Sequence, residues 1–495
     1  MERLNILSVI IFVPLLGALA MFFIKGAKLH FAKSIALLVS FFTLISSLNL
    51  LVFFEPNQSK LQFIEKYSWF PQFGVNYIVG VDGISLPLVL LSTFLVFLVV
   101  AVSKTTIEYA RAYFGMLLLL ATGILGSLLA LDGITFYAFW GMMLVPTYFL
   151  ISIWGGQRRE EAATRFALFS MFGSSLMLVA MIYLGVQTKL QFGEYSFLFS
   201  DWVNLKLSIE QEMMLFVAFV LAFAVNIPIF PLYYWLPTAY IAAPTAITII
   251  LAGAMSKLGI YGLIRFCMPV FSQASALSAS IFMCLGCVTI IYGVVMAWRQ
   301  TNLKSLLAYL SFGYVGFCVL SYGAMNIEGM QGTILQMISH GLIITGLFLL
   351  ADALYKRYGT YEIAEIRVLG RKMPILACVM LMFVFSFAAI PITSEFVAKL
   401  LILLAAFKSD YVFGGVAAFG IVLCVVCTLS VYCRMVFGNG GVDVSEQNKP
   451  LDLNWQELVI FISLFILIYI IGIKPQPLFN IVDPSAAVLL YSHLY

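Results

Sequence analysis

Long apolar stretches alternate with short polar segments along almost the whole chain. Fourteen stretches are long enough to cross a hydrocarbon core of about 30 Å. The first one lacks the small-residue cleavage site of a signal peptide, so we expect it to be retained as a helix. The expected crossings cover residues 4–24, 34–54, 84–102, 114–131, 133–154, 163–187, 213–236, 243–266, 277–297, 303–322, 330–354, 374–407, 413–436 and 456–474. This pattern predicts an all-α polytopic membrane protein.

Composition supports the same class. Hydrophobic residues make up 63% of the 495 residues and charged residues only 10%, which is too little charge to cover the surface of a soluble protein of this size. The net charge of +4 is small and dispersed, so it gives no indication of nucleic-acid binding. The crossings leave little chain for a water-exposed catalytic domain, and no nucleotide loop, haem motif or hydrolase motif is present.

The basic residues predict the orientation of the chain. If the N-terminus lies outside, seventeen lysines and arginines fall on the inner face and eight on the outer face, while Lys257 and Lys399 lie within helices. Loops on the cytoplasmic side of membrane proteins are enriched in lysine and arginine. We therefore expect both termini on the outer face.

Two expected helices contain prolines at membrane depth. The seventh contains Pro228 and Pro231, and the twelfth contains Pro391. Proline removes a backbone donor and interrupts helical bonding, and such backbone is tolerated in a membrane only where it faces protein or a hydrated cavity. Two similar breaks five crossings apart favour an internal repeat of the kind that transporters use. The alternative is a pair of unrelated kinks.

Few ionisable residues lie deep within the apolar stretches: Lys257, His340, Glu395 and Lys399. Each costs roughly 2.5–3.5 kcal/mol to insert and usually has a function. A desolvated lysine and a histidine can exchange protons near neutral pH, so these groups are candidate proton-binding stations. The alternatives are a structural lysine at 257, a core histidine at 340, and a salt bridge between Glu395 and Lys399, which stand four residues apart.

Two cysteine pairs, Cys284/Cys287 and Cys424/Cys427, have a spacing that metal sites use. No histidine or soluble knuckle accompanies them in the sequence, so we expect ordinary thiols within the helices. We predict no metal or cofactor on this chain. Any electron chemistry is then expected to belong to partner proteins.

Several motifs resemble the antiporter-like subunits, of the subunit M (chain 4) type, of respiratory complex I, NADH:quinone oxidoreductase. The resemblance covers nearly the entire chain in order, and the expected helix count agrees. The chain ends shortly after helix fourteen, without the long lateral helix of the related subunit L. The motifs are Tyr77–Leu88, Phe139–Pro146, Trp235–Pro237 with Ala243–Thr245, the segment around Lys257, Gln336–His340 and Asp452–Glu457.

The resemblance implies a fold of two inverted repeats with both broken helices in them. It divides the chain into N-terminal helices 1–3 (1–113), a first repeat (114–266), a second repeat (277–436), and helix fourteen with the tail (437–495). It also implies proton translocation through Lys257, His340, Glu395 and Lys399, driven by quinone reduction elsewhere.

The same resemblance implies a location in the bacterial cytoplasmic membrane. The expected partners are the lipid bilayer and other membrane-arm subunits, among them neighbouring antiporter-like subunits, with flavin, iron–sulfur clusters and quinone in partner subunits. The alternatives are a subunit of a multi-subunit cation/proton antiporter or membrane-bound hydrogenase, and a structural spacer that does not pump.

The sequence departs from the family at positions that are usually charged. A helix-five glutamate is replaced by Gly141 and a helix-seven lysine by Asn226. In the family these two form a charge pair that gates proton transfer. Loss of one partner alone strands a buried charge at a cost of roughly 3–5 kcal/mol, but loss of both is nearly charge-neutral. We therefore expect an assembled subunit whose first half-channel is altered or silent. The other departures are Tyr233, Thr238, Tyr314, Glu395 and Lys399.

Overall fold

The computed structural model describes residues 5–23, 29–103, 107–438 and 452–491. Within these ranges thirteen helices are long and apolar enough to cross a membrane. The expected twelfth crossing is divided into two shorter helices, α17 (Pro374–Phe387) and α18 (Ser394–Ser409). The prediction of an all-α polytopic membrane protein is confirmed, and the first apolar stretch is α1 (Ile6–Phe23), as expected.

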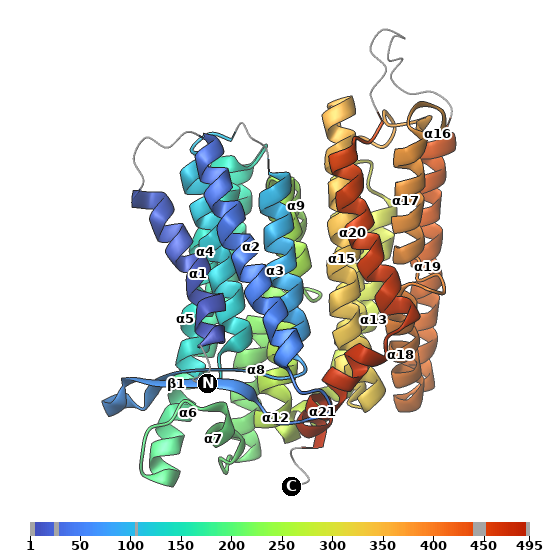
Figure 1. Cartoon of the computed structure of the whole chain (residues 1–495). Helices are drawn as coiled ribbons and strands as arrows, with labels where there is room; N and C mark the ends of the chain where they lie inside the picture. Colours follow the sequence, from blue (N-terminus) through green and yellow to red (C-terminus); the bar gives the residue numbers. More distant parts are fainter. Residues whose placement is uncertain (1–4, 24–28, 104–106, 439–451, 492–495) are drawn as a thin grey trace. The chain divides into compact units, whose positions relative to one another are not determined.

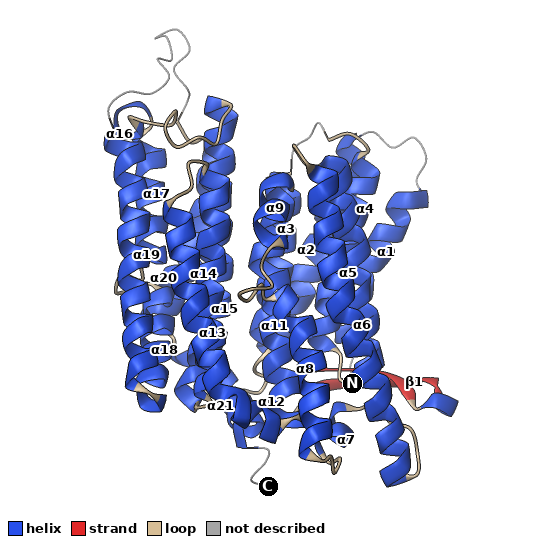
Figure 2. Ribbon diagram, turned by 180° about the vertical axis from the view of Figure 1, so that it is seen from behind, coloured by secondary structure: helices blue, strands red, loops and turns tan. Residues whose placement is uncertain are grey.

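The chain forms two compact units, shown in Figures 1 and 2. Unit 1 consists of Met1–Ile227, Ala242–Ser278 and Asn480–Tyr495, and unit 2 of Pro228–Ile241 and Ala279–Phe479. The four-part division expected from the resemblance stays a prediction. The first segment of unit 1, which ends at Ile227, contains the helices α1, α2 (Leu29–Phe53), α3 (Ser85–Val102), α4 (Ala110–Leu129), α5 (Gly133–Trp154), α6 (Arg159–Phe192), α7 (Phe199–Val203) and α8 (Ile209–Asn226).

The eighth crossing of the chain, which belongs to unit 1, is not a uniform α-helix. It runs through α10 (Thr245–Ile250), η2 (Leu251–Met255), α11 (Ser256–Gly262), η3 (Leu263–Cys267) and α12 (Met268–Val270), of which η2 and η3 are π-helical. In a π-helix the backbone bonds span five residues instead of four, and such segments are frequent at functional sites. Every residue in the most apolar part of this crossing is buried, so it forms the centre of unit 1.

A β-hairpin that the hydrophobic pattern did not predict lies across one end of the unit 1 helices (Figure 1). Strand β1 (Gln62–Phe70) pairs antiparallel with β2 (Val75–Val81), and the short helix η1 (Pro71–Phe73) connects them. Glu65 of β1 accepts hydrogen bonds from the backbone amides of Leu7 and Ser8 at the start of α1. The hairpin therefore holds the first turn of α1.

Unit 2 contains most of the second half of the chain. Its helices are α9 (Trp235–Ala242), α13 (Ser272–Trp298), α14 (Leu303–Ala324), α15 (Ile327–Tyr358), α16 (Leu369–Lys372), α17, α18, α19 (Tyr411–Phe437) and α20 (Trp455–Ile473). The unit boundaries fall within two of these helices, so α9 belongs to unit 2 up to Ile241 and α13 from Ala279 onward. The last helix, α21 (Gln476–Tyr491), continues from unit 2 into unit 1. α15 is buried throughout its most apolar part, whereas only 28% of the corresponding part of α20 is buried. α15 is therefore central and α20 peripheral, with its exposed apolar face suited to lipid.

Both helix breaks predicted from proline are confirmed. α8 ends at Asn226 and α9 begins at Trp235, with Pro228 and Pro231 between them. α17 ends at Phe387 and α18 begins at Ser394, on either side of Pro391. Helix termini leave backbone carbonyls and amides without helical partners. Each break therefore places such groups at membrane depth, where side chains can bind them.

Candidate functional site

Lys399 links the two halves of the broken twelfth crossing. Its side chain is buried, and Nζ donates a 3.1 Å hydrogen bond to the carbonyl oxygen of Phe387, the last residue of α17. The C-terminal end of a helix carries partial negative charge, which favours a cation. Lys399 therefore binds the carbonyl end that the break exposes.

Glu395 is the counter-charge of Lys399. It lies in the first turn of α18, is fully buried, and its Oε1 is 3.5 Å from Lys399 Nζ. The amino end of a helix favours a negative charge, so both charges lie at helix ends of matching polarity. The ion pair that the sequence allowed as an alternative is thus present, at a distance longer than that of a tight hydrogen bond.

Three aromatic rings surround the Lys399 ammonium. The ring centre of Tyr314 on α14 is 4.8 Å from Nζ, and those of Phe317 and Phe387 are 5.4 and 5.6 Å away. A cation over a ring face is attracted by the ring quadrupole, by about 2 kcal/mol when the cation is desolvated. These contacts stabilise a charged lysine without the water that it has lost.

Tyr314 also contacts His340 on α15. Their ring centres are 4.5 Å apart, with 30° between the planes, and both side chains are buried. The ring of Tyr314 therefore contacts both His340 and Lys399. Sequence reasoning identified this tyrosine only as a replacement for a family histidine. No local signal in the sequence links it to Lys399, which is 85 positions further along the chain.

Further polar side chains lie near the charged pair. The hydroxyl of Tyr314 and the side-chain amide of Gln336 lie beside the carboxyl of Glu395. The hydroxyls of Thr333 on α15 and Ser394 on α18 are buried, and none of the described protein groups hydrogen-bonds them. Buried polar atoms of this kind are generally satisfied by ordered water. The surroundings of Glu395 are thus more polar than those of a packed helical core.

Lys257 is held in unit 1 by the irregular eighth crossing. It is buried, and its Nζ donates hydrogen bonds to the carbonyl oxygen of Ala252 at 2.5 Å and to Ser256 Oγ at 3.3 Å. Ala252 belongs to the π-helical segment η2, which directly precedes Ser256. The side chain thus folds back on its own crossing toward a carbonyl of the π-helical turn.

The two positions where the family charge pair is missing lie in unit 1. A Cβ atom added at Gly141 on α5 would meet nothing within 4 Å. Asn226, the last residue of α8, lines a cavity of about 10 Å³ with Trp140, Ser170, Ser174 and five apolar residues, none of them ionisable. A cavity needs about 10–15 Å³ to hold one water, so this one is at the lower limit.

The structure brings three of the four predicted proton-binding residues together: His340, Glu395 and Lys399, all in unit 2. Lys257 belongs to unit 1, so the predicted path from Lys257 through His340 stays a prediction. The described residues contain no group of three or more His, Cys, Asp or Glu side chains that could hold a metal ion. The eight cysteines all lie within the described residues, and none of them forms a disulfide bond.

Comparison with known proteins agrees with this arrangement. Residues 130–424 match the model of the family described as NADH:quinone oxidoreductase/Mrp antiporter, transmembrane. The chain is 33% identical to NADH-ubiquinone oxidoreductase chain 4 of Marchantia polymorpha, covering 98% of this chain and 97% of that protein. It is 34% identical to NADH-quinone oxidoreductase subunit M of Rickettsia prowazekii (strain Madrid E), covering 99% of both.

A solved structure supports the same conclusion. A chain of respiratory complex I from Thermus thermophilus with bound NADH aligns with a TM-score of 0.87 and 25% identity, covering 98% of this chain and 99% of that chain. The alignment thus extends over nearly the whole length of both chains. The chain therefore belongs to the NADH:quinone oxidoreductase/Mrp antiporter transmembrane family.

Proposed function

We propose that the chain is a membrane-arm subunit, of the subunit M type, of a proton-pumping NADH:quinone oxidoreductase. Relatives that match it over almost their full length are named NADH-ubiquinone oxidoreductase chain 4 and NADH-quinone oxidoreductase subunit M. Its direct partners are the other membrane-arm subunits, and the flavin, iron–sulfur clusters and quinone belong to partner subunits of the complex and not to this chain. The chain acts in the bacterial cytoplasmic membrane with both termini on the outer face, and divides functionally at 1–113, 114–266, 277–436 and 437–495.

The buried Lys399–Glu395 pair is the observation that carries this proposal. A protein that only fills space has no need for two charges at a helix break, where apolar side chains would pack at lower cost. At 3.5 Å the two groups form an ion pair longer than a tight hydrogen bond, and the proposal assigns proton exchange to this pair. Ordered water at Thr333 and Ser394 would supply the donors and acceptors for that exchange.

The proton path in this proposal runs through Lys257, His340 and Lys399, with Glu395 as the counter-charge. The ring of Tyr314 contacts both His340 and Lys399, and its hydroxyl can both donate and accept a hydrogen bond. The first half-channel is altered or silent because Gly141 and Asn226 supply no charge. The cavity at Asn226 has no ionisable residue in its lining, which supports this part of the proposal.

Purification of the affinity-tagged chain from its native membrane tests the proposal. We expect mass spectrometry of the purified assembly to identify peripheral flavin and iron–sulfur subunits together with other antiporter-like chains. NADH-dependent quinone reduction should copurify with them. An assembly that holds only small antiporter subunits, with no redox protein, would contradict the proposal.

A further inference from the structure

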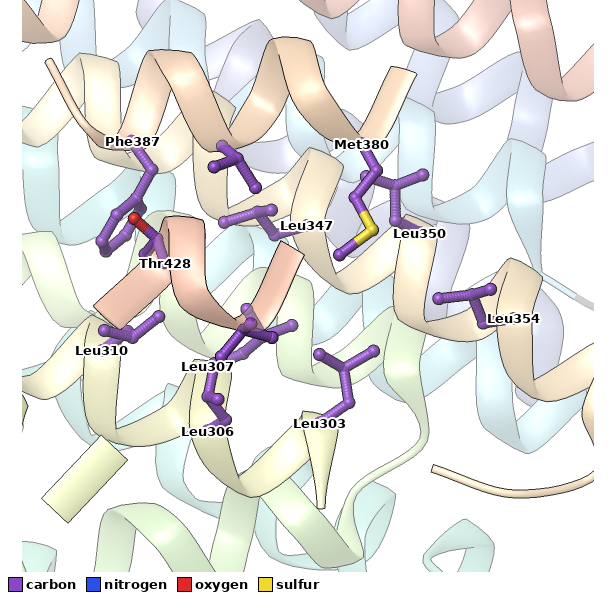
Figure 3. A pocket seen from close by; sticks show the side chains of 12 residues that line it. Leu303, Leu306, Leu307, Leu310, Leu347, Leu350, Leu354, Met380, Phe387 and Thr428 are labelled. Atoms are coloured by element: carbon purple, nitrogen blue, oxygen red, sulfur yellow. The ribbon is translucent and has the colours of Figure 1, made fainter. Parts of the chain in front are cut away.

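Unit 2 contains an apolar cavity of about 30 Å³ (Figure 3). Twelve side chains from α14, α15, α17 and α19 line it, and seven of them are leucines. Thr428 is the one lining residue with a hydroxyl, and this hydroxyl already donates a 2.8 Å hydrogen bond to the carbonyl oxygen of Cys424. A cavity without available polar partners stays dry even when a water would fit.

One end of the cavity adjoins the charged pair. Phe387, whose carbonyl oxygen accepts the hydrogen bond from Lys399, is one of the lining residues. Its ring centre is 4.7 Å from that of Tyr314. The apolar lining therefore begins directly beside the proposed proton site.

The other end of the cavity leads to a second group of charges. Leu303 on α14 and Leu354 on α15 belong to the lining. Next to Leu303, Lys304 donates a 3.2 Å hydrogen bond from Nζ to the carbonyl oxygen of Ile241, at the end of α9. Near Leu354, Asp352 forms a partly exposed ion pair with Lys356 at 2.7 Å. This end of the unit therefore reaches a polar environment.

The apolar layer between the two charged groups is thick. Lys304 and Tyr314 are ten residues apart on α14, about 15 Å at 1.5 Å per residue, and three cavity leucines lie between them. On α15, Leu347 and Leu350 lie between His340 and Asp352. The opposite direction along α15 contains buried polar side chains, since Gln336 and Thr333 lie toward the end of the unit where Glu328 pairs with Lys408.

We propose that these leucines form a dry barrier that blocks proton exchange between the Lys399–Glu395 pair and the Lys304 end of unit 2. The inference rests on the proposed function of that pair as a proton site. A hydrated proton cannot cross the layer without losing its water, and desolvation of a charge is expensive. The barrier makes access to Lys399 one-sided, and this is a condition for pumping instead of leakage.

The test uses the complete complex in liposomes, with no NADH present. A potassium gradient with valinomycin sets the membrane potential, and a pH-sensitive dye reports passive proton flow. Leu350→Asn places an amide in the middle of the barrier, so we expect proton flow to rise several-fold over the parent. Leu400→Asn is the matched control, because Leu400 on α18 is 44% exposed and lies outside the cavity lining.

Two further variants separate the barrier from the proposed proton site. Leu307→Thr adds a hydroxyl to the lining and removes one heavy atom, and it replaces Leu350→Asn in the test if that variant does not assemble. In the combination Leu350→Asn with Lys399→Met the leak should return to the parent rate, because the path through Lys399 is cut. A leak that persists in the combined variant supports the barrier but contradicts the role of Lys399. Assembled complexes of Leu350→Asn or Leu307→Thr that leak no more than the parent would overturn the barrier itself.

Discussion

Lys399 Nζ and the carbonyl oxygen of Phe387 form a 3.1 Å hydrogen bond across the break at Pro391. The lysine on α18 thereby binds the end of α17, and Glu395 on the first turn of α18 supplies the counter-charge. The proline break and the buried charges are thus parts of one arrangement. The break exposes a helix end, and that helix end helps to stabilise the lysine within the membrane.

The coupling between Glu395 and Lys399 can be measured by a double-mutant cycle. Lys399→Met leaves the Glu395 carboxylate buried without its cation, which we expect to cost about 3–5 kcal/mol of stability. Glu395→Gln with Lys399→Met removes both charges and should cost less than the sum of the single changes. The thermal stability of the chain within the detergent-solubilised complex provides the measurement. Additive effects would show that the two side chains do not interact.

The hydroxyl of Tyr314 is predicted to take part in proton transfer. Tyr314→Phe keeps the ring against His340 and Phe387, so assembly and electron transfer should be unchanged. Proton pumping should fall because the hydroxyl of the residue that contacts both His340 and Lys399 is lost. Tyr322→Phe, on the same buried helix, is the control. Equal pumping in the two variants would assign Tyr314 a packing role only.

The sequence predicted the helices and the breaks because these features are local. Hydrophobic length determines where a helix can cross the membrane, and a proline such as Pro391 marks a possible break. Proline alone does not fix a break, because Pro14 and Pro146 lie within the continuous helices α1 and α5. The contact of Tyr314 with both His340 and Lys399 depends on the packing of three helices, which no local pattern contains. The π-helical turn before Lys257 was also missed, because its apolar residues would suit a regular α-helix equally well.

The missing family charge pair leads to a prediction about restoring it. Gly141→Glu alone introduces an acid in a low-dielectric region without a lysine, so we expect lower stability or uptake of a proton by the new carboxyl. Gly141→Glu combined with Asn226→Lys should be tolerated better than the sum of the single changes. The open space at Gly141 leaves room for the glutamate. A double-mutant cycle that measures complex stability and proton movement tests whether the two positions are coupled. Additive effects of the two changes would mean that the two family residues were replaced independently.

Asp132, in the turn between α4 and α5, predicts a pH dependence of stability. Its Oδ1 accepts hydrogen bonds from the amides of Ile134 and Thr135, but burial raises the pKa of the carboxyl from 3.8 to about 6. The folded state therefore binds the proton more tightly than the unfolded state. Stability falls as the pH rises from about 4 to about 6, by about 3 kcal/mol, since one pKa unit corresponds to about 1.4 kcal/mol.

Asp132→Asn removes this titration and retains a good N-cap residue. We expect the melting temperature of the variant, relative to the parent, to increase between about pH 4.5 and 7.5. Thermal unfolding of both proteins in detergent at a series of pH values provides the measurement. A difference between variant and parent that does not change with pH would mean that Asp132 does not titrate in this range.

The proton-to-electron stoichiometry of reconstituted complexes containing Lys257→Met tests the central claim most directly. Lys257 is the buried lysine of the eighth crossing, whereas Lys189 on α6 is exposed, so Lys189→Met is the matched control. With Lys257→Met we predict normal assembly and electron transfer from NADH to quinone, but fewer protons moved per electron than in the parent and the control. An unchanged stoichiometry in the assembled Lys257→Met complex would contradict the account and remove Lys257 from the proton path.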